Sequence, residues 1–150
     1  MNVWDGTMTR DDERNERVET FPCGRVWVDE ALGILRVTFE PEVTIYLAEA
    51  QAQVAAMQRL TAGTPMPCLV DMTEIRKTDR AAREYYAGPE TRKAASACAM
   101  MIGSSGIGAV IGNFMLALYG DRLMPLKLFT REDDAVAWLV GFVERPARPR

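Results

Sequence analysis

The chain has 150 residues, of which 48% are hydrophobic and 26% are charged, and its formal net charge is −3. This length and composition are typical of one globular domain with a buried core, and the charge excludes a general nucleic-acid binder, which needs a concentrated basic surface. The sequence contains no histidine, which excludes Ser-His and Cys-His nucleophile systems, imidazole metal sites and the usual general base near neutral pH.

The ends of the chain bound the domain. Residues 1–20 are charged and mixed in sign, so they cannot form a signal peptide, and we expect a flexible N-terminal segment. A single domain is expected over residues 21–145, followed by a C-terminal tail over residues 146–150. Because no apolar stretch reaches the length needed to cross a bilayer, we expect a cytoplasmic protein with no membrane span.

The three cysteines, Cys23, Cys68 and Cys98, include no C-x-x-C pair. Two of them lie inside apolar strand candidates, and cysteine is commonly a small core residue. We therefore expect buried free thiols, no metal site and no cofactor.

A β-hairpin is predicted to open the domain. Two β-rich segments, 25–30 and 34–39, are separated by a short link that contains a glycine, which is typical of paired antiparallel strands. Residues alternate along the second segment, so one of its faces is apolar and the other is partly wet. Pro41 ends this strand because proline cannot donate to a β-ladder.

A helix follows the hairpin. Thr44 can cap a helix that runs to about Leu60, and the alanines and glutamines on its other positions suit a face exposed to water. Its inward-facing stripe has helical spacing and consists of Leu47, Ala50, Val54, Met57 and Thr61.

The run from Met66 to Thr73 is predicted to be the central strand. It is opened by Pro65, is too short for a buried helix, and ends in an acid and a hydroxyl. Such a run is typical of a strand covered on both faces. Its polar end then lies at the carboxyl edge of the sheet, where α/β proteins bind ligands and partners.

The second half of the domain alternates between helices and strands. A polar loop over 74–80 leads to a helix capped by Thr78 or Asp79, with Tyr85 and Tyr86 as packing residues, and then to a short helix near 90–96. The remaining predicted elements are a buried strand over 97–102, an apolar helix over 109–119, a strand over 126–129, and a helix that begins at 130–133 and carries Ala135, Trp138, Leu139, Phe142 and Val143 on its inner face.

The predicted order is β-β-α-β-α-β-α-β-α. An opening hairpin followed by this alternation indicates an α/β fold with a mixed sheet whose later strands are mostly parallel.

In this order, several segments resemble the bacterial STAS/SEC14-type, SpoIIAA-like domains, from about Phe21 to Glu144. Beside the hairpin, the segments that carry the resemblance are Pro-Met-Pro-Cys-Leu-Val-Asp-Met-Thr, Met-Met-Ile-Gly-Ser, Ile-Gly-Asn-Phe-Met and Leu-Phe-Thr-Arg-Glu-Asp-Asp-Ala-Val-Ala-Trp-Leu. The resemblance implies a small α/β domain without intrinsic catalysis. STAS relatives antagonise anti-sigma factors or belong to regulatory and transporter assemblies, whereas SEC14-like relatives hold lipids.

The sequence departs from this family at its phosphorylation switch. Anti-sigma-factor antagonists carry Asp-Ser-Ser-Gly at a helix start, but here Asp79 is followed by Arg80 and Ala81. Neither serine position holds a hydroxyl group, so a phosphorylation-controlled antagonist is not expected. Thr78 is adjacent, and its modification would add negative charge at the helix start.

Three groups of residues are candidate sites, and none of them is catalytic. The first is a predicted rim for a protein partner or a small polar ligand, for which helix capping and solvated charge are the alternative: Asp71, Thr73, Arg76, Thr78, Asp79 and Arg80. The second is a turn that could hold an anion or simply cap a helix: Gly103, Ser104, Ser105 and Gly106. The third is an apolar set that serves as dimer interface, ligand wall or plain core: Met101, Ile107, Ile111, Phe114, Met115 and Met124.

These observations favour a non-enzymatic regulatory or protein-interaction module that forms a homodimer. The alternative is a carrier or sensor of a lipid or other small apolar ligand, which requires a cavity of roughly a few hundred Å³. A nucleotide- or phosphate-binding enzyme built on the glycine-serine turn is less well supported, because the turn lacks the lysine of a P-loop.

Overall fold

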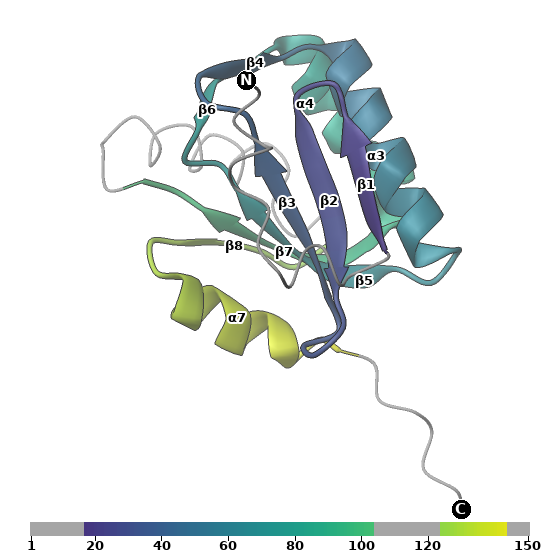
Figure 1. Cartoon of the computed structure of the whole chain (residues 1–150), viewed down its shortest axis with the longest axis vertical. Helices are drawn as coiled ribbons and strands as arrows, with labels where there is room; N and C mark the ends of the chain where they lie inside the picture. Colours follow the sequence, from purple (N-terminus) through teal and green to yellow (C-terminus); the bar gives the residue numbers. More distant parts are fainter. Residues whose placement is uncertain (1–16, 104–123, 144–150) are drawn as a thin grey trace, which may run out of the picture.

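The computed structural model describes residues 17–103 and 124–143. In these residues six strands form one sheet in the order β1-β2-β3-β5-β7-β8, and two more strands, β4 and β6, form a separate pair (Figure 1). The bounds of the main strands are Val18–Phe21 for β1, Gly24–Asp29 for β2, Ile34–Phe39 for β3, Met66–Asp71 for β5, Ala95–Met101 for β7 and Leu126–Phe129 for β8.

The mixed sheet predicted from the sequence is confirmed. Strands β1, β2 and β3 pair antiparallel, whereas β3, β5, β7 and β8 pair parallel. Strand β5 lies between β3 and β7, so the run that opens after Pro65 is a central strand. Pro67 has no N–H to donate, and the ladder with β7 shifts register between Met66 and Pro67.

Three strands were not predicted. β1 (Val18–Phe21) begins inside the segment expected to be flexible, and it pairs with β2. β4 (Val43–Ile45) and β6 (Ile75–Thr78) pair parallel to each other beyond the carboxyl edge of β5. Residues 74–80, predicted to be a polar loop, therefore contain a strand.

The helices begin close to the predicted positions, but two of them end earlier than predicted. Residues 95 and 96, expected in the short helix near 90–96, lie in β7, and Phe142 and Val143, expected on the inner face of the last helix, lie after its end at Val140. Helix α3 spans Leu47–Thr61 and follows Tyr46, so the prediction that Thr44 caps it is wrong, because Thr44 lies in β4. Leu47, predicted on the inward-facing stripe, is 38% exposed because it lies at the first position of the helix, beyond the sheet that covers the other four residues of the stripe. The other helices are α4 at Arg80–Tyr86, α5 at Pro89–Arg92 and α7 at Glu132–Val140. Asp79 stands at the N-cap position of α4, but its side chain makes no capping hydrogen bond.

Helices cover both faces of the sheet. Helix α3 packs on β1 and β2 and also contacts α4, whereas α7 packs on β5, β7 and β8 from the opposite side (Figure 1). Because strand side chains alternate between faces, β5 contributes Cys68 to the α3 side and Leu69 to the α7 side. The two sides therefore have separate cores, which we call the α3 face and the α7 face.

Close backbone packing requires glycine at the start of β2. A Cβ atom added to Gly24 would lie 2.1 Å from the carbonyl oxygen of Thr38 and 2.8 Å from the ring of Phe21. This position brings β1, β2 and β3 together beneath α3, where the rings of Phe21 and Phe39 meet edge to face with centroids 5.8 Å apart.

Candidate functional site

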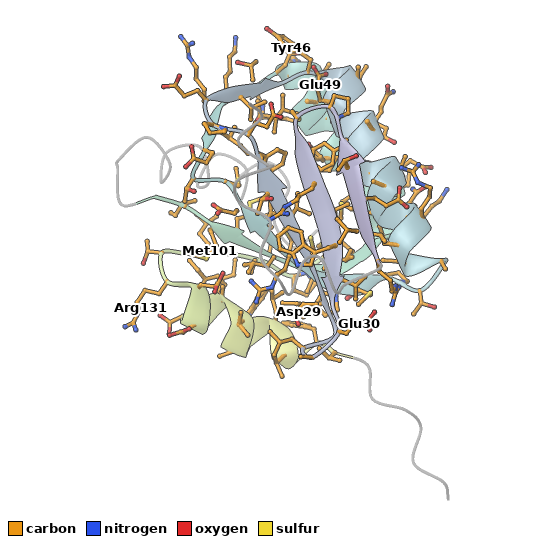
Figure 2. All side chains as sticks on the ribbon, viewed as in Figure 1. Asp29, Glu30, Tyr46, Glu49, Met101 and Arg131 are labelled. Carbon is orange, nitrogen blue, oxygen red and sulfur yellow. The ribbon has the colours of Figure 1, made fainter. Side chains whose placement is uncertain are left out.

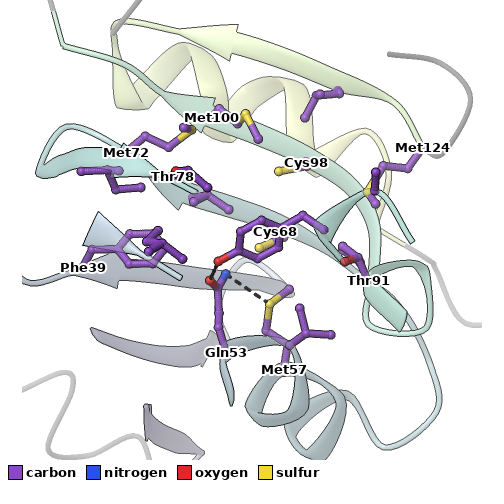
Figure 3. Close-up of a pocket in the computed structure, with 18 residues that line it drawn as sticks. Phe39, Gln53, Met57, Cys68, Met72, Thr78, Thr91, Cys98, Met100 and Met124 are labelled. Carbon is purple, nitrogen blue, oxygen red and sulfur yellow. Dashed lines mark hydrogen bonds between the residues drawn. The ribbon is translucent and has the colours of Figure 1, made fainter. Parts of the chain in front are cut away.

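A cavity of about 90 Å³ lies on the α3 face, between the sheet and helices α3, α4 and α5. The wall of the cavity is mostly apolar (Figure 3). Ile45 of β4 and Ile75 and Thr78 of β6 also line it, so this small sheet forms part of the wall. We call this cavity the α3-face pocket. Among the residues that line it are four methionines and two cysteines: Met57, Met72, Met100, Met124, Cys68 and Cys98.

The two cysteines form part of the wall contributed by the sheet. Cys68 of β5 and Cys98 of β7 are register partners in neighbouring parallel strands. Both are buried free thiols, as is Cys23 on β1's connection to β2. Burial raises the pKa of the Cys98 thiol to about 12 and that of Cys68 well above its ordinary value, so both thiols stay protonated near neutral pH.

A polar pair interrupts the apolar wall. Gln53 of α3 is only 4% exposed, and its side-chain oxygen accepts a hydrogen bond from the hydroxyl of Tyr86 of α4. The carboxamide nitrogen of Gln53 donates to the sulfur of Met57 over 3.7 Å (Figure 3). Burial, followed by the nearby Cys23 and Glu49, raises the pKa of Tyr86, which keeps its hydroxyl neutral and able to donate.

Gln53 and Tyr86 were not predicted as site residues. The sequence predicts that the glutamines of α3 lie on a water-exposed face. For Gln53 that prediction is wrong, because the residue is buried. Its spacing contains the missing signal, since Gln53 is three residues after Ala50 and four before Met57, both of which are buried. Tyr86 does pack in the core, as predicted, and it also provides a hydrogen-bond donor.

The residues of the predicted rim are held mostly by local contacts. The carboxylate of Asp71 accepts hydrogen bonds from the backbone N–H of Thr73 at 3.0 Å and from its hydroxyl at 2.6 Å. Arg80 pairs with Glu84 one turn further along α4, at 3.1 Å and in an exposed position. Arg76 is exposed on β6. These contacts are those expected of turn formation and helix stabilisation.

Thr78 differs from the rest of the rim because it faces inward. It is 8% exposed and lines the α3-face pocket. The next residue, Asp79, donates its backbone N–H to the carbonyl oxygen of Ile45 at 2.8 Å, which ties β6 to β4. Thr78 is therefore a buried residue of the pocket wall and not part of an exposed rim.

The two other predicted groups, the apolar set and the glycine-serine turn, do not form one site among the described residues. Met124 lines the α3-face pocket, whereas Met101 packs on the α7 face, so the structure does not bring these two methionines together. Gly103, the first residue of the predicted turn, is the last described residue before the gap at 104–123. The other predicted residues lie outside the described residues: Ser104, Ser105, Gly106, Ile107, Ile111, Phe114 and Met115.

The described residues contain neither a metal site nor a membrane-spanning helix. Among residues 17–103 and 124–143, no group of three or more His, Cys, Asp or Glu side chains is arranged to hold a metal ion. In the same part of the chain, no helix combines the length and apolar character needed to cross a membrane.

Comparison with protein families shows the family to which the chain belongs. Residues 26–143 match the family described as Domain of unknown function (DUF7793). The chain belongs to this family. No curated protein matches it.

A solved structure supports the fold. The chain is similar to an uncharacterized protein of the DUF3478 family with a SpoIIAA-like fold, from Shewanella loihica PV-4, with a TM-score of 0.55 and 15% sequence identity. The similarity covers 82% of this chain and 94% of that one. It confirms the predicted SpoIIAA-like fold.

Proposed function

We propose that this DUF7793 domain is a non-enzymatic sensor that binds a small, mostly apolar molecule in the α3-face pocket. The observation that carries the proposal is the pocket itself, an apolar space lined by the sheet and three helices. Pockets of this kind, with few polar groups in an apolar wall, are typical of small-molecule sites. The methionines support it further, because their flexible thioether side chains adapt to a guest.

The size of the pocket limits the ligand. At about 90 Å³ it does not reach the roughly few hundred Å³ expected from the sequence for a carrier of a lipid or other apolar ligand, and it is smaller than the roughly 150 Å³ cavity that holds benzene in an engineered protein. A ligand of one small ring, accommodated by movement of the methionines, fits better than a lipid with long acyl chains. This favours the sensor over the lipid carrier.

Toluene is a suitable probe for the site. We expect it to raise the melting temperature of the protein and to shift the amide signals of pocket residues in an NMR titration. The variant Ala95→Leu places three more carbon atoms at a buried residue that lines the pocket, and it should abolish binding. Ala81→Leu on α4, outside the pocket wall, is the control and should bind as the natural chain does. If the folded natural chain and the folded Ala81→Leu variant respond neither to toluene nor to other one-ring probes, the proposal is wrong.

A second candidate function is protein interaction through a homodimer. Tyr46 and Leu47 are 55% and 38% exposed, and they lie next to β4, which pairs with the strand that carries Arg76. Exposed large apolar side chains beside charged ones are typical of protein contacts. Light scattering should report a dimer for the natural chain and a monomer for Tyr46→Ser/Leu47→Ser. A monomer in both would remove this candidate.

A further inference from the structure

The polar atoms in the wall of the α3-face pocket describe the ligand more closely than its size does. Gln53 is buried, yet its carboxamide nitrogen has a single hydrogen-bond acceptor within the described residues, the Met57 sulfur at 3.7 Å. Sulfur is a weak acceptor, and an amide nitrogen carries two hydrogens. One N–H of Gln53 is therefore available to an oxygen atom placed in the pocket.

Tyr86 fixes the orientation of this amide. Its hydroxyl donates to the Gln53 oxygen, so that oxygen already accepts one hydrogen bond and the nitrogen is the donor that a ligand can use. The pKa of Tyr86 is raised by burial, so the phenol keeps its proton near neutral pH and remains a donor to this oxygen.

Thr91 on α5 adds a second polar atom. Its hydroxyl oxygen is buried and has no hydrogen-bond partner in the part of the chain that the structure describes. Thr91 lines the same pocket as Gln53, and Figure 3 shows the two side chains on different sides of it. A buried hydroxyl without a partner is costly, and a ligand that supplies one removes that cost.

We infer that the α3-face pocket selects a small apolar molecule that carries one hydroxyl or carbonyl oxygen, which accepts a hydrogen bond from Gln53. This inference rests on the proposed function, since it names the class of ligand for the same pocket. Thr91 is the secondary contact, which a hydroxyl ligand can also reach. The selectivity arises because a purely apolar guest would leave the Gln53 N–H and the Thr91 hydroxyl without water or partner.

Phenol and toluene test the inference, because they have the same number of heavy atoms and nearly the same shape and differ in one hydroxyl. Their dissociation constants are measured by NMR titration for each variant. For the natural chain we expect phenol to bind at least as tightly as toluene, although toluene leaves water more readily. In Gln53→Leu the preference should shift toward toluene by about tenfold, since the hydrogen bond is lost.

Gln58→Leu is the matched control. It makes the same change on the same helix, but the Gln58 amide donates outside the pocket, to the backbone oxygen of Glu90 at 3.0 Å and to its carboxylate at 2.8 Å. We expect the phenol-to-toluene ratio of the natural chain. Thr91→Val, which keeps the side-chain shape, should shift the ratio toward toluene by less than Gln53→Leu does.

The outcomes separate the two proposals. If both probes bind but their ratio is the same in Gln53→Leu as in the natural chain, the inference is wrong and the pocket binds apolar molecules without reading an oxygen. If neither probe binds to the folded natural chain, the proposed function itself is wrong. If Gln53→Leu fails to fold, Gln53→Met keeps the length of the side chain and is expected to give the same shift.

Discussion

The two faces of the sheet are built from the same strands but differ in how they are filled. On the α7 face, small alanines of β7 let helix α7 approach closely, and the gaps are closed by aromatic rings: Trp138 lies 5.7 Å from Phe129 and 4.8 Å from Phe142 between centroids. On the α3 face the wall includes methionines, thiols and a buried amide around a cavity (Figure 3). The α7 face is therefore closely packed, whereas the α3 face contains a cavity.

Two ion pairs also hold the elements of the α7 face together. Arg36 of β3 contacts Asp29 of β2 at 2.9 Å and Glu132 at the start of α7 at 3.1 Å. The arginine side chain is half-buried, whereas Glu132 is exposed, so the link to the helix is weaker than the link within the hairpin. Together they join the hairpin to the helix that closes this face. Figure 2 shows Asp29 at the end of β2 and Arg131 directly before the first turn of α7.

The largest expected effect comes from opening a cavity on the filled face. Leu139 is fully buried in α7, so Leu139→Ala should lower the free energy of unfolding by about 3 kcal/mol. Val140, next to it, is 43% exposed, and Val140→Ala should change that free energy by less than about 0.5 kcal/mol. Urea unfolding followed by circular dichroism measures both. A loss below about 1 kcal/mol for Leu139→Ala would show that this face is loosely packed.

A smaller effect is expected from adding volume to each face. Ala99 and Ala95 both lie on β7, but Ala99 packs in the α7 core and Ala95 lines the pocket. Ala99→Val should lower the free energy of unfolding by about 2 kcal/mol through overpacking, whereas Ala95→Val should leave it nearly unchanged because the cavity accepts two more carbons. Equal losses in thermal unfolding would contradict the difference between the faces.

The polar pair of the pocket should show coupling. Tyr86→Phe leaves the Gln53 oxygen buried without its donor and should cost about 1.5 kcal/mol. Gln53→Leu/Tyr86→Phe removes both polar groups, and we expect it to be more stable than the single variant. The free energies of a double-mutant cycle measure this. Additive losses would mean that the two side chains do not depend on each other.

Up to pH 9, the smallest effect is a pH dependence that comes from the thiols of the α3 face. Cys98 has an ordinary pKa of 9.0 and a folded value of about 12. Between these values the unfolded chain has lost the proton that the folded chain keeps, so stability is full below pH 9 and falls as pH rises toward 12. At pH 9 the loss is about 0.4 kcal/mol for this thiol. Cys98→Ala should have a shallower slope of unfolding free energy against pH, and an unchanged slope would assign the loss to other groups.

Much of the architecture could be read from the chain because its signals are local. Apolar residues of β5 are bounded by Pro65 and Asp71, and β8 occupies the four residues predicted for it. The spacing along α7 identified Ala135 and Leu139, which are both buried. In each case the period of apolar residues matches the geometry of one element, so the pattern is complete within about ten residues.

The candidate site was decided by contacts between distant segments. Strands β4 and β6 have three and four residues and pair across the whole of α3 and β5, so neither has a local pattern that predicts it. Gln53 has a polar side chain, and its burial depends on Tyr86, which lies 33 residues later. The pocket is the volume that three helices and a sheet leave unfilled, which no periodicity encodes. Sequence alone therefore determined the elements and the sheet of this protein, and only tertiary packing decided where it has room for a ligand.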